Sequence, residues 1–356
     1  MIIYIILSVI VTMNIVKLTD EKEKAIRKIN VYLLLKMFLN VIVASAITLV
    51  IVIKVERKDW FLVILTPLLS FFFSLLDSII LYRPIQYFRK LDCSKWKYYQ
   101  QVIGDNIMLY IFWFAASLFY SFGGRDKDDY VYMLLYFFFW IIINYLVIIA
   151  RKYIMDCKLC TNEKLKRIVE KNKMEGYRIY EYDGKSRKTA NAMVDSFFGI
   201  GNIYFSDYLL EHLEEDEIEA IYLHEIGHIK KHHITIRNVL LMMCMPFMYC
   251  VGVVMDEIEK YHSINIPLGI LICSMIMIGY MVFLYLYISR KQEYVADYYA
   301  AVHVNNSETL CTALKKLTQL NDVLGSSSSK DMLKTHPAVD KRIEKIKKMN
   351  KEGSYR

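Results

Sequence analysis

Long apolar runs are the feature that most limits how this chain of 356 residues can fold. A transmembrane helix needs about 20 consecutive apolar residues to cross the hydrocarbon core of a bilayer. Runs near that length explain why 55% of the chain is hydrophobic, above the roughly 45–50% of soluble domains. The predicted spans are Ile2–Val16, Asn30–Ile53, Trp60–Tyr82, Asn106–Phe122, Tyr130–Ala150, Asn238–Met255 and Ile264–Ile288. We therefore expect a polytopic α-helical membrane protein with about seven transmembrane helices.

The distribution of basic residues predicts the orientation of these spans. Short cytoplasmic loops of membrane proteins carry an excess of Lys and Arg. Loops 17–29 and 83–105 carry five each, whereas loops 54–59, 123–129 and 257–263 carry three, two and one. The same bias explains the net charge of +8 without a nucleic-acid partner. We predict an outside N-terminus, a cytoplasmic C-terminus and the lipid bilayer as a partner.

The spans divide the chain into four regions. Residues 1–150 hold five spans, and residues 151–237 form a small polar α+β unit. Residues 238–289 form a transmembrane hairpin, and residues 290–356 form a cytoplasmic tail. In the polar unit, the stretches RIYEYDG, TANAMVDSFF and NIYFSDYL carry the aromatic and β-branched residues of strands, and glycines separate them.

Three helices are predicted outside the spans. Ser206 or Asp207 can cap a short helix, Tyr208–Glu214. A second helix is expected from about Glu215 through His233, because acidic residues crowd its start and the basic run KKHH its end, as the helix dipole favours. We expect that basic end to lie among anionic lipid headgroups. A third helix is expected over Glu308–Leu320.

The stretch IYLHEIGHIKKHH holds the densest chemistry in the sequence. His224 and His228 are four residues apart, so on a helix both imidazoles lie on one face and can reach one metal ion. Glu225 lies at the edge of that face. This is the HExxH pattern of zinc peptidases, with two nitrogen ligands and a carboxylate as general base. The alternatives are a chance match or a histidine-rich helix end that faces lipid headgroups.

A zinc site of this kind needs a third protein ligand. The metzincin pattern would place a histidine at position 234, which is Ile234, and His232 lies one turn too far along a straight helix. Glu293, in RKQEYVAD just after the last span, is the better candidate. Asp297 follows one helical turn later, where a carboxylate can fix a histidine tautomer. The two spans between His228 and Glu293 then form a hairpin that returns Glu293 to the same side.

The order of four features resembles the integral-membrane gluzincin zinc metalloproteases: HEIGH, a two-span hairpin, EYVAD and THPAVDKRI. This group includes the type I CAAX prenyl endopeptidases and the bacterial heat-shock membrane proteases. The resemblance covers roughly residues 187–345 and includes TANAMV, which is similar to the edge strand over the active site in that family. Five spans ahead of HEIGH resemble the CAAX branch, because the heat-shock branch typically has two.

The resemblance implies the residues of a metal centre. One zinc ion per chain would be bound by His224, His228 and Glu293, and Glu225 would act as general base. Asp297 would form a hydrogen bond with a liganding histidine. The fold implied is a helical membrane region with a small α+β cytoplasmic zinc-peptidase domain.

The resemblance also implies that Asn191, His336 and Arg342 line the substrate cleft. His336 or Arg342 would then be catalytic as the donor to the oxyanion, a contribution of roughly 3–4 kcal/mol. In the alternative interpretation, His336 caps a C-terminal helix and Arg342 belongs to a solvated basic run. An extended peptide can add as a strand beside TANAMV.

These observations favour a membrane-embedded zinc metalloendopeptidase that cleaves membrane-associated peptides or proteins near the cytoplasmic face. Its role is either C-terminal processing of lipidated CAAX-type substrates, which the span count favours, or quality control of damaged membrane proteins. The rival class is a non-enzymatic channel, transporter or zinc-regulated sensor. Against it, no pair of spans broken by Gly or Pro suggests a transport site. The sequence does not predict the oligomeric state.

Two further features are explained more simply. Cys157 and Cys160 form one CxxC, but a four-thiolate zinc site needs a second pair. Lys36 and Asp77 lie inside predicted spans near their cytoplasmic ends, where they either extend to the interface or face a water-filled interior.

Overall fold

The computed structural model describes residues 92–100, 129–172, 177–243, 266–321 and 337–351, with single positions between 68 and 86, at 103 and between 246 and 258. The predicted spans Ile2–Val16, Asn30–Ile53 and Asn106–Phe122 lie outside the described residues, as do Lys36 and Asp77. Two others, Trp60–Tyr82 and Asn238–Met255, are described only in part.

Helix α5 (Asp129–Ile154) coincides with the predicted fifth span. Among the described residues, its segment Leu134–Ile154 is the one helix whose length and apolar composition suffice to cross a membrane. Asn144 is buried on this helix and accepts a hydrogen bond of 2.6 Å from the amide of Asn238 on α9 (His233–Met242). The pair satisfies two polar side chains where two apolar helices meet.

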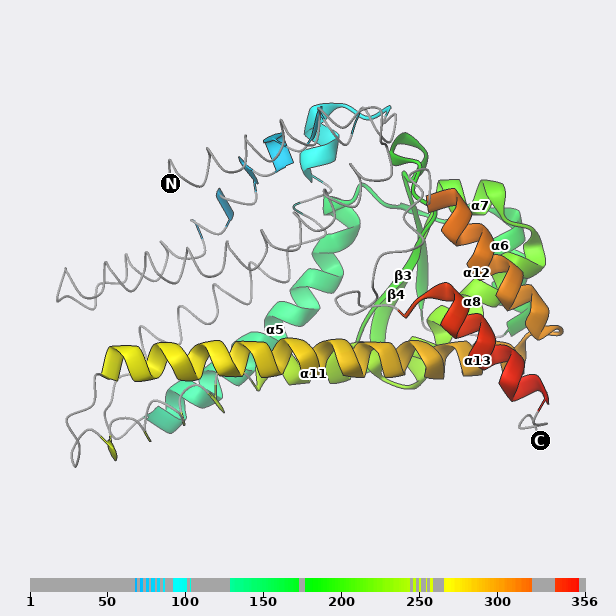
Figure 1. Ribbon diagram of the computed structural model, residues 1–356. Coiled ribbons are helices and arrows are strands. Elements are labelled where there is room, and N and C mark those ends of the chain that lie inside the picture. The colour runs from blue at the N-terminus through cyan, green and yellow to red at the C-terminus, as the bar shows by residue number, and fades with distance from the viewer. Residues whose placement is uncertain are drawn as a thin grey trace, which may run out of the picture.

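A four-stranded sheet lies next to α5 in sequence and space (Figure 1). Its strands, in spatial order, are β1 (Lys158–Leu159), β2 (Arg178–Tyr182), β4 (Ile200–Ser206) and β3 (Ala192–Phe197). β2 and β4 are parallel, and the other two pairs are antiparallel. The three predicted strands are therefore present, and β3, which carries the second half of TANAMV, is an edge strand among the described residues.

Short helices gather at one end of the sheet around a central helix, α8 (Glu215–Lys230). Residues Ile218–Ile229 of α8 are buried without a break, so the HEIGH stretch lies in the main hydrophobic core. The surrounding helices are α6 (Glu163–Asn172), α7 (Asp207–His212), α12 (Ser307–Asn321) and α13 (Val339–Lys351). Helices α7 and α12 occupy the predicted ranges to within two residues, and Ser206 caps α7 by accepting a hydrogen bond from the Leu209 amide.

The helix predicted to run through His233 ends earlier than expected. α8 stops at Lys230, and His232 adopts a left-handed backbone conformation with φ 53° and ψ 31°. A new helix, α9, then begins at His233. The prediction of one continuous helix was wrong because a single left-handed residue turns the chain, and the run KKHH carries no glycine or proline to mark the turn.

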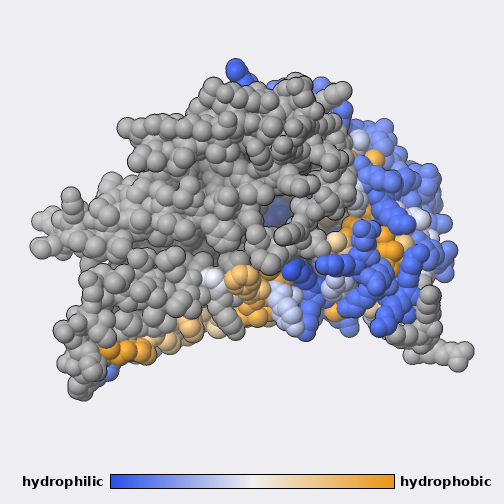
Figure 2. Space-filling model, in the orientation of Figure 1, coloured by the Kyte–Doolittle hydropathy of each residue, from blue (hydrophilic) through white to orange (hydrophobic). Residues whose placement is uncertain are grey.

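Helix α11 (Ile266–His303) is the long helix that runs across the lower part of Figure 1, from yellow to orange. It contains most of the predicted span Ile264–Ile288, and the boundary predicted between residues 289 and 290 falls inside this continuous helix. Figure 2 shows apolar residues along α11, whereas polar residues cover the end formed by α6, α12 and α13. A single helix thus links an apolar region with the polar region that contains HEIGH.

Gly227 lets α8 and α11 approach closely. A methyl group added at Gly227 would lie 3.1 Å from the Ala296 Cα and 3.1 Å from the Tyr299 Cβ. The central glycine of HEIGH is therefore a packing residue, and its contact brings the face of α8 that carries the histidines against the face of α11 that carries Glu293.

Candidate metal centre

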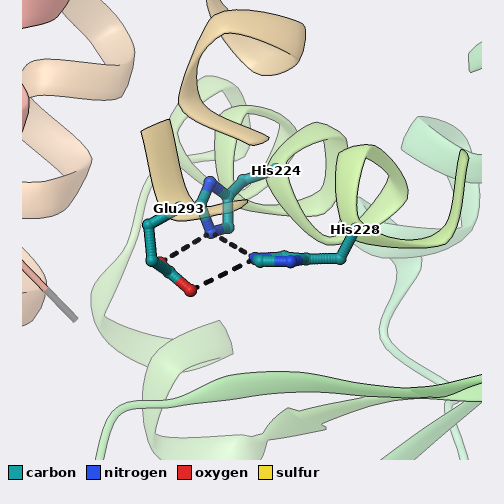
Figure 3. A group of neighbouring side chains, drawn as sticks. All are labelled: His224, His228 and Glu293. Atoms are coloured by element: carbon teal, nitrogen blue, oxygen red, sulfur yellow. Dashed lines mark hydrogen bonds and ion pairs between the residues drawn. The ribbon is translucent and has the colours of Figure 1, made fainter. Parts of the chain in front are cut away.

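Two helices bring three metal-ligand side chains into one buried group (Figure 3). His224 and His228 project from α8, and their Nε2 atoms are 3.2 Å apart. Glu293 reaches them from α11, with its Oε1 3.5 Å from His228 Nε2 and its Oε2 3.6 Å from His224 Nε2. The three residues are 6%, 5% and 1% exposed.

The spacing of these atoms fits a zinc ion. Ligands about 2.0–2.1 Å from a tetrahedral zinc lie about 3.3–3.4 Å from one another. The two Nε2 atoms, 3.2 Å apart, are close to that value, and each lies 3.5–3.6 Å from one oxygen of Glu293, Oε1 for His228 and Oε2 for His224. One ligand atom from each of the three residues lies within 4.8 Å of the other two. Two imidazoles and one carboxylate are also the protein ligands of a common class of catalytic zinc sites, which keep a fourth position open.

Asp297 and Arg342 form a buried pair behind His224. The Nδ1 atom of His224 donates to Asp297 Oδ1 at 3.1 Å. Arg342, on α13, binds both carboxylate oxygens of Asp297, through Nε at 2.8 Å and Nη2 at 2.5 Å. Its Nη1 lies 3.6 Å from Glu293. Arg342 is 7% exposed, which excludes the alternative of a solvated basic run.

Opposing effects set the pKa values in this group. Burial favours the neutral acid of Asp297, but the positive charge of Arg342 and its hydrogen bonds outweigh burial and lower the pKa of Asp297 to about 2. Burial also opposes a charge on His224, yet the hydrogen bonds to Asp297 and Glu293 raise its pKa to about 9 without metal. The pKa of His228 falls well below its ordinary value because of burial and the neighbouring His224.

A model of peptidase family M48 matches residues 161–350, which is more than half of the chain and includes every residue of this group. The chain belongs to peptidase family M48.

Two curated relatives of this M48 chain illustrate the sequence similarity. A protein named "Protease HtpX homolog" from Helicobacter pylori is 27% identical over 166 residues, which cover 40% of this chain and 52% of the relative. "Protease HtpX homolog 2" from Methanosarcina mazei is 27% identical over 176 residues, which cover 41% of this chain and 58% of the relative. The M48 chain thus spans about half the length of the curated relatives it matches.

The solved structure of Ste24p from S. mikatae shows a similar fold. The aligned part covers 95% of this M48 chain and 88% of the Ste24p chain, with a TM-score of 0.61 and 17% sequence identity.

The remaining predicted residues lie in different surroundings. Glu225 is buried on α8 beside His224, at 8% exposed. Asn191 is exposed and lies directly before β3. Two hydrogen bonds with Ser206 fix its backbone: the Asn191 amide donates to Ser206 Oγ at 3.0 Å, and the Ser206 amide donates to the Asn191 carbonyl at 2.9 Å. His336 lies outside the described residues.

Sequence reasoning missed His233. Its Nδ1 lies 2.9 Å from the Nδ1 of His228, and the side chain is 4% exposed, so it does not face lipid headgroups. Burial and the charge of Arg237 lower its pKa to about 4. Lys230, Lys231 and His232 are exposed, as expected for the basic end of α8. On a straight helix His233 would not share the face of His228, and only the break at His232 brings them together.

The CxxC pair lies apart from this centre. Burial raises the pKa of Cys157 to about 12 and of Cys160 to about 11, so both thiols keep their protons. Cys160 Sγ contacts Glu181 Oε2 at 3.8 Å. Both cysteines are half-buried, and a protonated thiol in such a place packs as a small apolar side chain.

Proposed function

We propose that this M48 chain is a membrane-embedded zinc metalloendopeptidase that binds one zinc ion through His224, His228 and Glu293. The observation that carries the proposal is the convergence of two imidazoles and a carboxylate in one buried group, whose ligand atoms all lie within 4.8 Å of one another. Asp297 holds His224 in the tautomer that leaves Nε2 free for the metal, and Arg342 keeps Asp297 ionised.

Glu225 acts as the general base in this proposal. Zinc, when bound, supplies Lewis acidity that lowers the pKa of water to about 7 and polarises a carbonyl group. Glu225 follows His224 directly on α8, so its carboxylate stands at the edge of the ligand group without joining it. It takes a proton from the attacking water and returns it to the leaving amine. His336 and Arg342 are the candidate donors to the oxyanion.

The edge of the sheet is the proposed site for the peptide. Within the described residues β3 pairs only with β4, so its other edge is available to an extended substrate. Asn321 on α12 fixes the start of that edge, since its amide donates to the Ala190 carbonyl at 2.7 Å and accepts from the Ala190 amide at 2.9 Å. Asn191, the next residue, is thereby held at the entrance as the proposed contact with substrate.

The substrate class follows from the surroundings of the site. Helix α11 runs from an apolar segment directly to Glu293, so a membrane-associated peptide, lipidated in the manner of CAAX substrates, can reach the centre from the bilayer. We place the chain in the membrane with seven spans, an outside N-terminus, and the catalytic domain and C-terminus in the cytoplasm. The similarity to Ste24p over 95% of this chain supports the processing role.

Quality control of membrane proteins is the second candidate. It is favoured by the sequence similarity to the HtpX homologues, which covers about 40% of this chain. A direct comparison separates the two roles: the purified chain is offered a farnesylated CAAX peptide and an unfolded membrane protein without lipid. Faster cleavage of the lipidated peptide supports processing, and faster cleavage of the unfolded protein supports quality control.

The test of the enzymatic proposal is Glu225→Gln, with Asp216→Asn as the control. Asp216 is an exposed carboxylate in the first turn of the same helix. Both substitutions turn a carboxylate into an amide, Glu225→Gln within the site and Asp216→Asn away from it. Glu225→Gln should retain zinc and lose cleavage of casein or of a lipidated reporter, while Asp216→Asn keeps both. Undiminished cleavage by Glu225→Gln would reject this site as the source of the cleavage and count against the protease proposal.

A further inference from the structure

We propose that His233 is a positioning residue for His228, because it accepts the proton on Nδ1 and so fixes the tautomer that presents Nε2 to the metal. The proposal rests on the zinc site described above and adds a residue that the HExxH pattern and the third ligand do not include.

The two nitrogens of His228 face different partners. Its Nε2 points into the ligand group, 3.2 Å from His224 Nε2 and 3.5 Å from Glu293. Its Nδ1 points the opposite way and lies 2.9 Å from the Nδ1 of His233. The rings of His228 and His233 meet edge to face at 76°, with centroids 5.0 Å apart, which is the arrangement of a directional hydrogen bond rather than of stacking.

The chemistry of imidazole decides which ring donates. Two facing Nδ1 atoms at hydrogen-bond distance must share one proton, since two lone pairs or two N–H groups would repel. A metal ligand needs the lone pair on Nε2, so the proton of neutral His228 sits on Nδ1 and is donated to His233. His233 therefore accepts through Nδ1 and carries its own proton on Nε2.

The two ligand histidines are thus held by different acceptors. His224 donates to the carboxylate of Asp297, which is the usual kind of partner for a metal-bound imidazole. His228 donates to a neutral imidazole instead. Because Glu225, Glu293 and Asp297 are already buried in or beside the ligand group, a neutral acceptor would orient His228 without adding a fourth buried carboxylate.

The backbone around His233 is fixed from two directions. The left-handed residue His232 ends the α8 segment and places His233 at the start of α9, back against His228. Gln292 on α11 donates to the His233 carbonyl at 3.2 Å. Since Gln292 directly precedes Glu293, the same turn of α11 holds both the third ligand and the partner of the second ligand.

Two amide side chains provide the decisive test. In His233→Asn the Oδ1 atom stands close to the position of Nδ1 and can accept from His228, whereas in His233→Gln the Oε1 atom stands nearer the position of Nε2. His233→Leu removes the acceptor altogether. His232→Asn is the control, because His232 is the exposed neighbour and asparagine tolerates its left-handed conformation.

The measurement is the zinc dissociation constant of each purified full chain, by competition with a chromophoric chelator, with the melting temperature of the zinc-free protein recorded alongside. We expect His233→Leu and His233→Gln to bind zinc about 10–100-fold more weakly, the usual loss when the acceptor behind a ligand histidine is removed. His233→Asn and His232→Asn should bind as the parent does.

Equal zinc affinity in His233→Asn and His233→Gln would overturn the proposal. It would also be overturned if all three His233 variants lost zinc affinity in proportion to the fall in their zinc-free melting temperatures. These results leave the protease proposal intact, because that proposal depends on cleavage and on Glu225. A parent chain that binds zinc but cleaves nothing would reject the protease proposal, while the expected order of zinc affinities would still support the role of His233.

Discussion

The contact between α8 and α11 at Gly227 should decide whether the metal centre assembles, and Gly227→Ala tests it. The new Cβ would lie 3.1 Å from the Ala296 Cα, 3.1 Å from the Tyr299 Cβ and 3.3 Å from the Ala296 carbonyl oxygen. Carbon atoms pack best about 3.5–4.0 Å apart, so the helices must separate by roughly half an ångström. The neighbours are backbone atoms and a Cβ, which cannot rotate away.

The effect of this substitution on stability is small because two contributions oppose each other. Alanine gains about 1 kcal/mol over glycine inside a helix. Overpacking a tight contact costs about 1–3 kcal/mol. The expected net loss is therefore roughly 0–2 kcal/mol in the free energy of unfolding. Zinc affinity should fall more clearly, because Glu293 lies on the displaced helix, about one turn before Ala296 and nearly two turns before Tyr299.

The assay compares Gly227→Ala with Gly279→Ala. Gly279 lies in α11 as well, and a Cβ added there meets nothing within 4 Å. Gly279→Ala should therefore keep parental zinc affinity in the chelator competition, and Gly227→Ala should lose affinity and cleavage together. Parental zinc affinity in Gly227→Ala would refute the claim that this close approach places Glu293.

Three further predictions concern the buried group and the helix pair. Glu293→Ala should lower the zinc content of the purified chain, measured by atomic absorption, and full occupancy would reject Glu293 as a ligand. Arg342→Met should lower the free energy of unfolding by about 3–5 kcal/mol, measured with denaturant, because it leaves the Asp297 carboxylate buried without its arginine partner. Arg342→Lys should be more stable than Arg342→Met but less stable than the parent, since lysine cannot bind both carboxylate oxygens. Asn144→Ala and Asn238→Ala, singly and together in a double-mutant cycle, should show a coupling of roughly 0.6 kcal/mol, whereas strict additivity would show that their hydrogen bond does not contribute.

Local patterns in the sequence were sufficient to predict helices and strands whose residue types or caps lie within the element itself. The aromatic and β-branched stretches predicted β2, β3 and β4, and Ser206 predicted the start of α7 because a hydroxyl cap acts within one turn. The end of α8 was predicted wrongly. His232 adopts a left-handed conformation between α8 and α9, and nothing in KKHH indicates it.

The sequence by itself determined the spacing of His224 and His228, because four residues on a helix always place two side chains on one face. It also pointed to Glu293 as a carboxylate that a hairpin could return to the same side. The tertiary structure alone decided the distances among these three residues, the burial of Arg342 against Asp297, and the contact of His233 with His228. These depend on how closely α8, α11 and α13 pack, and that packing is set by side chains far apart in the chain, such as Gly227 and Ala296.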